Sequence, residues 1–441
     1  MTGAVFRSLV AAALLVTLPL ALAVAVSAQR GRLFTQSRDH PAIQYSTHKT
    51  TDRVALLNAS LDAGSTSLAF NPESGYLRSV LQALRVPIES QSLVYSQTSS
   101  QGAFISRRNP RALFFNDAIA VGWVRGAPQL ELAALDPEMG VIFYTLEQRS
   151  ADRPRFKRDD SCLECHQTPD TLGVPGYFVM SVFSVPAASD KYSYATGEAT
   201  DHRSPLTDRW GGWYVTGHSP EPHLGNLPIA ATPAAVKRAS RELDSLGGEF
   251  DTKGYPSTQS DIAALMVLEH QTHMTNLLTR MGWESRIAAS APRSGATPQA
   301  RPRPGTGAPI DPVKDTAQEL VDYMLFVDEA PFPGRVRGSP GFAQKFAEAG
   351  PVDSKGRSLR QISLERRLMR YPCSYMIYSD AFDALPALAK DAVYERLWQL
   401  LSGREKGGVY ARLSLADRRD VVEILKETKK GVPGYFTTPA Q

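Results

Sequence analysis

The apolar residues of this chain change their spacing partway along it, and that change limits the folds open to it. Between residues 92 and 146, short runs of aromatic and β-branched residues alternate with turn signals, as in antiparallel strands. Beyond residue 312, apolar residues recur every three or four positions, as in amphipathic helices. The pattern predicts an α+β fold, with a mostly antiparallel sheet in the N-terminal and central region and an all-α C-terminal region.

Turn residues and helix-end signals give the bounds of the expected elements. A helix over 75–86 ends at Pro87. Beyond the strands of the first region, extended runs recur at 177–185 and 213–216. Expected strands of the first region are 92–95, 112–115, 119–124, 130–134 and 141–146. Later helices are expected at 233–246, 261–281, 314–328, 358–371, 388–402 and 415–430.

Two of these helices carry clear end signals. For 261–281, Ser260 is the expected N-cap and Gly282 the expected C-cap. For 415–430, Ser414 and Asp417 have capping-box spacing, and Gly431 with Pro433 marks the end.

The length of 441 residues exceeds one ordinary domain. We expect an apolar N-terminal signal peptide (1–28), an α+β domain (29–150), a region that includes the predicted helix 261–281 (151–288), a Pro/Gly/Ala-rich linker (289–312) and an all-helical C-terminal domain (313–441). With Lys plus Arg at 49 and Asp plus Glu at 45, the formal charge of +4 is too small to indicate a nucleic-acid partner.

The first 28 residues have the pattern of an export signal. A short start with Arg7 precedes an uncharged apolar run that ends in Val26, Ser27 and Ala28. We expect cleavage after Ala28, with an uncleaved membrane anchor as the alternative because the run is long enough to span a bilayer. Either way the rest of the chain is exported, in a bacterium to the periplasm, and it contains no further apolar segment of that length.

The most specific motif is C-x-x-C-H, formed by Cys162, Cys165 and His166. In this motif the sequence resembles the c-type cytochromes, although the resemblance covers these residues alone. It implies that the region 151–288 binds one covalent haem c. Thioethers from Cys162 and Cys165 would hold the haem, and His166 would be the proximal ligand of its iron. A redox-active disulfide, a zinc site and a structural disulfide are the alternatives.

The second axial ligand decides whether such a haem transfers electrons or reacts. His270 and His273 lie on the otherwise apolar stripe of the predicted helix 261–281, where a buried imidazole requires a partner. His223 follows the predicted strand 213–216 in a loop, and is the third candidate. Ordinary core or surface histidines are the alternative for all three; Met180 is a weaker candidate because strand alternation favours a core role.

The expected function is therefore single-electron transfer by a periplasmic monohaem c-type cytochrome-like protein with a redox partner protein. The alternatives are a haem-dependent oxidase or peroxidase with an open distal site, and a haem-based redox or gas sensor. Arg153, Arg155, Lys157 and Arg158 could dock an acidic partner or hold haem propionates, or form a solvated loop. The third cysteine, Cys373, is expected to be a small buried core residue.

Overall fold

The protein was analysed as a computed structural model that describes residues 32–186, 193–229, 241–291 and 311–439. The expected signal peptide, nearly all of the linker and most of the expected helix 233–246 lie outside these residues. Where 241–246 are described, they are not helical.

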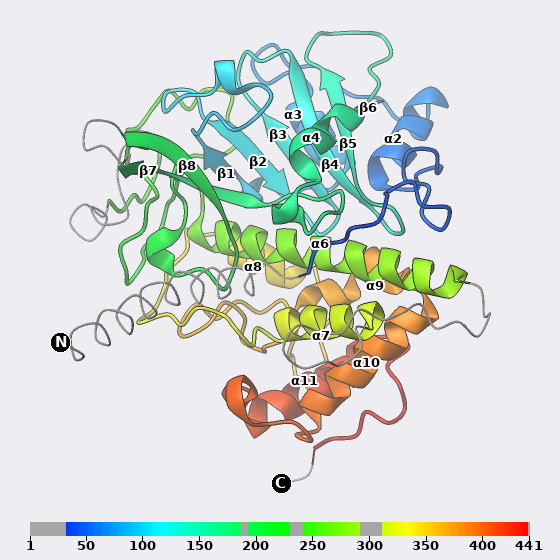
Figure 1. The fold of residues 1–441 in the computed structure, drawn as a ribbon. Helices are drawn as coiled ribbons and strands as arrows, with labels where there is room; N and C mark the ends of the chain where they lie inside the picture. The colour runs from blue at the N-terminus through cyan, green and yellow to red at the C-terminus, as the bar shows by residue number, and fades with distance from the viewer. Residues whose placement is uncertain (1–31, 187–192, 230–240, 292–310, 440–441) are drawn as a thin grey trace, which may run out of the picture.

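A seven-stranded antiparallel sheet forms the N-terminal and central region (Figure 1). Its strand order is β6-β5-β4-β3-β2-β1-β9, so neighbours in sequence are neighbours in the sheet up to the last strand. Strands β7 (Val179–Pro186) and β8 (Ser193–Thr200) form a separate hairpin. The sheet strands are β1 (Ser92–Val94), β2 (Arg111–Phe115), β3 (Ile119–Trp123), β4 (Gln129–Asp136), β5 (Gly140–Glu147), β6 (Lys157–Arg158) and β9 (Trp213–Tyr214).

The two faces of this sheet are covered differently. Tyr144 on β5 donates a 2.7 Å hydrogen bond to Asp52, the N-cap of α2 (Arg53–Asp62), so α2 lies over the Tyr144 face. Successive strand residues point to opposite faces. Phe143 therefore points the other way, toward the short helix α4 (Leu163–His166), which crosses the front of the sheet in Figure 1.

The longest helix, α6 (Ile262–Ser290), lies between the sheet and the C-terminal helices (Figure 1). Both expected caps were wrong. The side chain of Asp261, not Ser260, accepts the hydrogen bond from Ala263 N, and Ser260 instead donates to Tyr214 O. Gly282 lies inside the helix, because buried Trp283 and Ser285 continue its packed surface for two more turns.

The expected helix 358–371 was also wrong. This segment folds back on itself, with Ile362 bridged to Met369 and Ser363 N donating to Leu368 O at 2.9 Å. Leu364 at the turn has φ 58°, which a helix does not allow. Its apolar residues are buried by the fold-back rather than along a helix face.

Four other predicted helices are confirmed, whereas 233–246 is not, and the fold class is confirmed: an antiparallel α+β region followed by helices. The confirmed set is α3 (Leu77–Ala83), α7 (Pro312–Met324), α10 (Ala387–Leu401) and α11 (Leu415–Thr428), the last with the expected capping box. The helices α2, α4, α8 (Phe342–Glu348) and α9 (Asp380–Asp383) were not predicted. One hydrophobic cluster runs from Phe34 to Phe436, and the division into domains stays a prediction.

Replacing Gly282 by alanine should stabilise the protein by about 0.5–1 kcal/mol, because glycine is entropically unfavourable inside a helix. An added Cβ would meet only Leu385, at an ordinary 3.6 Å. Urea unfolding measures the change. Gly140→Ala is the matched control: Gly140 has φ 86° and its Cβ would collide with Thr279, so that variant should be less stable. A destabilised Gly282→Ala variant would contradict the prediction.

Candidate functional site

The C-x-x-C-H residues occupy a tight turn that leads directly into α4. The side chain of Asp159 caps this turn by accepting from Ser161 N, and buried Leu163 fixes it to the core. Residues three positions apart lie on the same side of such a helix, which brings Cys162 and Cys165 together. Both are free thiols; Cys165 is exposed and Cys162 half-buried. Burial raises the pKa of Cys162 to about 11.

His166 presents one ring nitrogen and uses the other internally. Its Nδ1–H donates to the carbonyl of Gly176 at 3.0 Å, and its ring lies 4.8 Å from that of Phe143 and 6.3 Å from that of Phe178. Burial lowers its pKa. The imidazole is therefore neutral at pH 7 with its tautomer fixed, and within the described residues Nε2 has no hydrogen-bond partner. This is the state in which histidine binds a metal.

Helix α6 holds the carbonyl that orients His166. Asn276 on α6 accepts from Tyr177 N at 3.3 Å and donates to Tyr177 O at 3.1 Å, which clamps the backbone next to Gly176. A side chain at Gly176 would collide with the Asn276 amide. The glycine is thus required for a close approach between this segment and α6.

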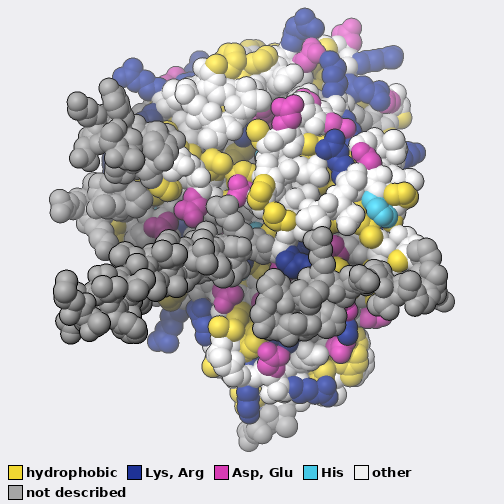
Figure 2. Space-filling model, viewed as in Figure 1, with side chains coloured by type: hydrophobic (Ala, Val, Ile, Leu, Met, Phe, Trp, Pro, Cys, Tyr) yellow, Lys and Arg dark blue, Asp and Glu magenta, His cyan; other side chains and the backbone are white. Residues whose placement is uncertain are grey.

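Small side chains line the sheet face beside the motif. In register across four strands lie Phe115, Ala120, Ala133 and Phe143, and the two alanines are only partly buried. Figure 2 shows apolar side chains exposed on this side, between the β7–β8 hairpin and α4. A flat apolar ligand could lie against such a surface, with His166 at its edge.

One ion pair crosses this face. Arg111 on β2 reaches Glu131 on β4 at 2.5 Å by passing over Gly122 on the intervening strand, where any side chain would collide with the guanidinium. Ser100 donates to Glu131 at 2.5 Å. The charges of Arg111 and Glu131 act on the pKa of His166, which places the pair beside the motif. The Nε of Arg111 is buried without a partner, a donor that a ligand could satisfy.

His270 has no free ring nitrogen. Its Nδ1 contacts Nδ1 of His202 at 2.8 Å and its Nε2 contacts the hydroxyl of Ser374 at 2.7 Å, while Phe326 and Tyr323 stack on the ring. Such partners are those of a structural core histidine, the alternative that the sequence left open.

His273 is also partnered. Its Nε2 lies 3.2 Å from a guanidinium nitrogen of Arg203, and its Nδ1 lies 3.9 Å from Asp201. It lines a cavity of about 190 Å³ together with Pro169 and Asp170, which follow the motif by a few residues. The cavity connects α6 to the segment that follows the C-x-x-C-H motif, and the His273 ring lies in a polar cluster with Arg203 and Asp201.

His223 is the one distal candidate whose ring lacks a hydrogen bond among the described residues. The side chain is buried, with Trp210 edge-on at 5.0 Å and Nδ1 unpartnered. Burial lowers its pKa to about 4, so the imidazole is neutral at pH 7. A buried imidazole without a partner is costly, which makes His223 the candidate most in need of a ligand.

Sequence reasoning missed the buried polar network on α6. Glu269 pairs with Arg209 at 3.0 Å, both fully buried, and accepts from Thr200 at 2.8 Å. Burial raises the pKa of Glu269 to about 7, against the opposing effect of Arg209. The available signal was the carboxylate of Glu269 within an apolar helix. Its partners Arg209 and Thr200 could not be predicted, because they lie some 60 residues away in sequence.

The basic run before the motif is largely neutralised locally. Arg155 pairs with Asp62, Lys157 with Glu147 at 2.8 Å, and Arg158 with Asp160 at 2.8 Å. Cys373 is fully buried, and burial raises its pKa to about 12, as expected for a core residue.

Comparison with protein-family models, with curated proteins and with solved structures finds no match. Among the described residues, no three His, Cys, Asp or Glu side chains converge as for a metal site made by protein ligands alone. No helix in the described part of the chain is both long and apolar enough to cross a membrane.

Lowering the pH should destabilise the protein through the buried imidazoles. Burial lowers the pKa of His270 to about 3, against 6.5 when unfolded, so the unfolded state takes up a proton that the folded state refuses. The stability is fully present above pH 6.5 and is lost progressively as the pH falls toward 3. For this one residue the loss from pH 7 to pH 5 is about 2 kcal/mol.

Urea unfolding at both pH values measures that loss, and His270→Gln should reduce it. His48→Gln, the same substitution at an exposed histidine, is the control, and His270→Gln should reduce the loss more than it does. An equal pH dependence in wild type and His270→Gln would contradict the prediction.

Proposed function

We propose that this chain binds one covalent haem c through Cys162 and Cys165, with His166 as proximal ligand, and transfers single electrons as an exported protein. The observation that carries the proposal is the hydrogen bond from His166 Nδ1 to the Gly176 carbonyl, beside two free thiols on one turn. Within the described residues this leaves Nε2 unprotonated and without a hydrogen-bond partner, so its lone pair could bind iron.

The residues present fit such a group in three independent respects. The thiols are reduced and adjacent, the sheet face next to them carries small, partly buried side chains, and Arg111 keeps a buried donor unpartnered. When bound, haem supplies an iron that cycles between two oxidation states. The export pattern of residues 1–28 supports the same conclusion, because such a protein would meet its redox partner outside the cytoplasm.

The chain's own part is to fix the iron ligand and to shield it. The Gly176 carbonyl prevents rotation of the His166 ring and increases the basicity of Nε2, as hydrogen-bonded carbonyls do for metal-bound histidines. The tilted rings of Phe143 and Phe178 lie 4.8 and 6.3 Å from the His166 ring, so its surroundings are partly apolar. Both effects favour a stable ligand with little rearrangement on electron transfer.

Covalent haem should be lost in Cys162→Ala/Cys165→Ala when the protein is produced with a cytochrome c maturation system. Without the two thiols no thioether can form, so the denatured polypeptide should show no haem on a gel stained for haem and no haemochrome spectrum in alkaline pyridine.

Cys373→Ala is the matched control, because it removes the remaining cysteine and should retain a full complement of haem. Wild-type protein without covalent haem under these conditions would refute the proposed function.

The distal ligand is tested by carbon monoxide. A reduced wild-type protein with two strong axial ligands should show a sharp α band that carbon monoxide does not shift. His223→Ala should make the spectrum sensitive to the gas, since His223 is the distal candidate without a hydrogen bond, whereas His270→Ala should not.

A wild-type spectrum that shifts with carbon monoxide would instead favour the oxidase, peroxidase or sensor functions. Sensitivity in His270→Ala but not in His223→Ala would contradict the assignment of His223.

A further inference from the structure

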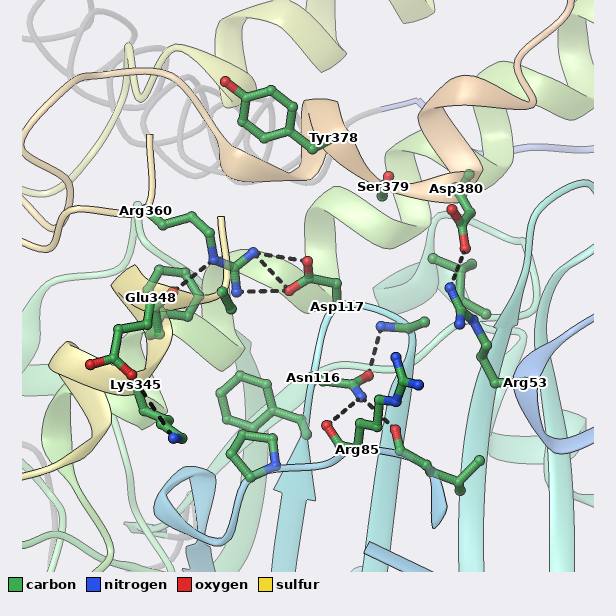
Figure 3. A pocket seen from close by; sticks show the side chains of 18 of the residues that line it. Arg53, Arg85, Asn116, Asp117, Lys345, Glu348, Arg360, Tyr378, Ser379 and Asp380 are labelled. Atoms are coloured by element: carbon green, nitrogen blue, oxygen red, sulfur yellow. Dashed lines mark hydrogen bonds and ion pairs between the residues drawn. The ribbon is translucent and has the colours of Figure 1, made fainter. Parts of the chain in front are cut away.

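A cavity of about 630 Å³ lies away from the C-x-x-C-H motif, between the β2–β3 turn and the C-terminal region (Figure 3). Its volume is in the range of small-molecule sites. Aromatic side chains form much of its lining: the ring of Phe342 lies 5.9 Å from that of Phe115 and 5.6 Å from that of Phe346. An apolar body would be desolvated there.

The charged residues around this cavity are not balanced. Four cations line it, Arg53, Arg85, Lys345 and Arg360, against the three anions Asp117, Glu348 and Asp380. Arg53 pairs with Asp380 at 2.9 Å, and buried Arg360 holds Asp117 through both carboxylate oxygens at 2.8–3.1 Å. Lys345 and Glu348 are 3.9 Å apart.

The remaining cation, Arg85, has no side-chain hydrogen bond or ion pair with any described residue. Figure 3 shows it beside Asn116, across the cavity from Lys345 and Arg360. An anion bound at Arg85 would therefore not have to displace an existing carboxylate partner.

The backbone of Arg85 supports a role for its side chain. It occupies the position after the C-cap of α3, where Val86 N donates to Leu81 O at 2.8 Å and Arg85 N to Gln82 O at 3.1 Å. This is the Schellman arrangement, whose left-handed residue is usually glycine. Arg85 has φ 54°, a left-handed backbone conformation that favours glycine, yet the residue carries a long cationic side chain. Strain of this kind concentrates at ligand sites.

We propose that this cavity binds a small amphipathic monocarboxylate, with its apolar body on the aromatic lining and its carboxylate on Arg85. The charge excess of one and the unpaired guanidinium favour an anion with one charge. The shared chemistry fits either an acyl chain or an aryl carboxylate. The site does not depend on haem, and the proposed function can fail without affecting it.

Calorimetric titration of the full-length protein with octanoate and with 2-naphthoate tests the proposal. At least one should bind saturably with one equivalent, and the tighter probe indicates an acyl or an aryl ligand. 1-Octanol has the same alkyl chain length as octanoate but no carboxylate, and it should bind at least tenfold more weakly than octanoate. Arg85→Gln should weaken carboxylate binding about ten- to hundred-fold. Arg78→Gln, an exposed arginine of α3 outside the cavity, should have no effect.

Arg85→Gly separates binding from folding. Because glycine suits the left-handed backbone, this variant should have an equal or higher Tm and still lose carboxylate binding as Arg85→Gln does. The proposal is overturned if neither carboxylate binds saturably at millimolar concentration, if octanol binds as well as octanoate, or if both Arg85 variants bind like wild type.

Discussion

Almost complete burial of α6 is the constraint on which the rest of the structure depends. The helix has the sheet and the His166 segment on one side and the C-terminal helices on the other, so it has no solvent-exposed face over most of its length. A helix apolar on all sides could rotate or slide between such layers. Its polar residues fix its position, because each unpaired polar group would be costly in that environment.

These polar residues reach segments far apart in the sequence. Gln271 donates to Asn116 O at 2.8 Å in the β2–β3 turn and accepts from Tyr375 at 2.7 Å in the C-terminal region. Asn276 holds Tyr177, and Arg280 holds Glu319 on α7. The candidate haem site therefore depends on α6 indirectly. Asn276 on the helix positions the backbone at Tyr177, and the neighbouring Gly176 carbonyl orients His166.

The fold class and most elements could be predicted from the sequence, because the spacing of apolar residues and the positions of turn-forming residues are local properties. The five first strands and the helices α3, α10 and α11 follow from spacing alone. At residues 358–371, Ser260 and Gly282 the prediction was wrong because tertiary packing and hydrogen bonding outweigh the local preference. The candidate site residues Cys162, Cys165 and His166 were selected by their spacing and stay a prediction. The partners of His270 and His273 could not be predicted, because His202, Ser374 and Arg203 are distant in sequence.

The shortness of α4 affects how the proposed haem would be attached. A single helical turn has no stability of its own, and this one is held chiefly by Leu163 and by the His166–Gly176 hydrogen bond. Its amides belong to the low-stability end of the molecule and those of α6 to the high-stability end. Under the proposed function, a local opening of α4 would expose both thiols to a haem-attaching enzyme while the core stays folded.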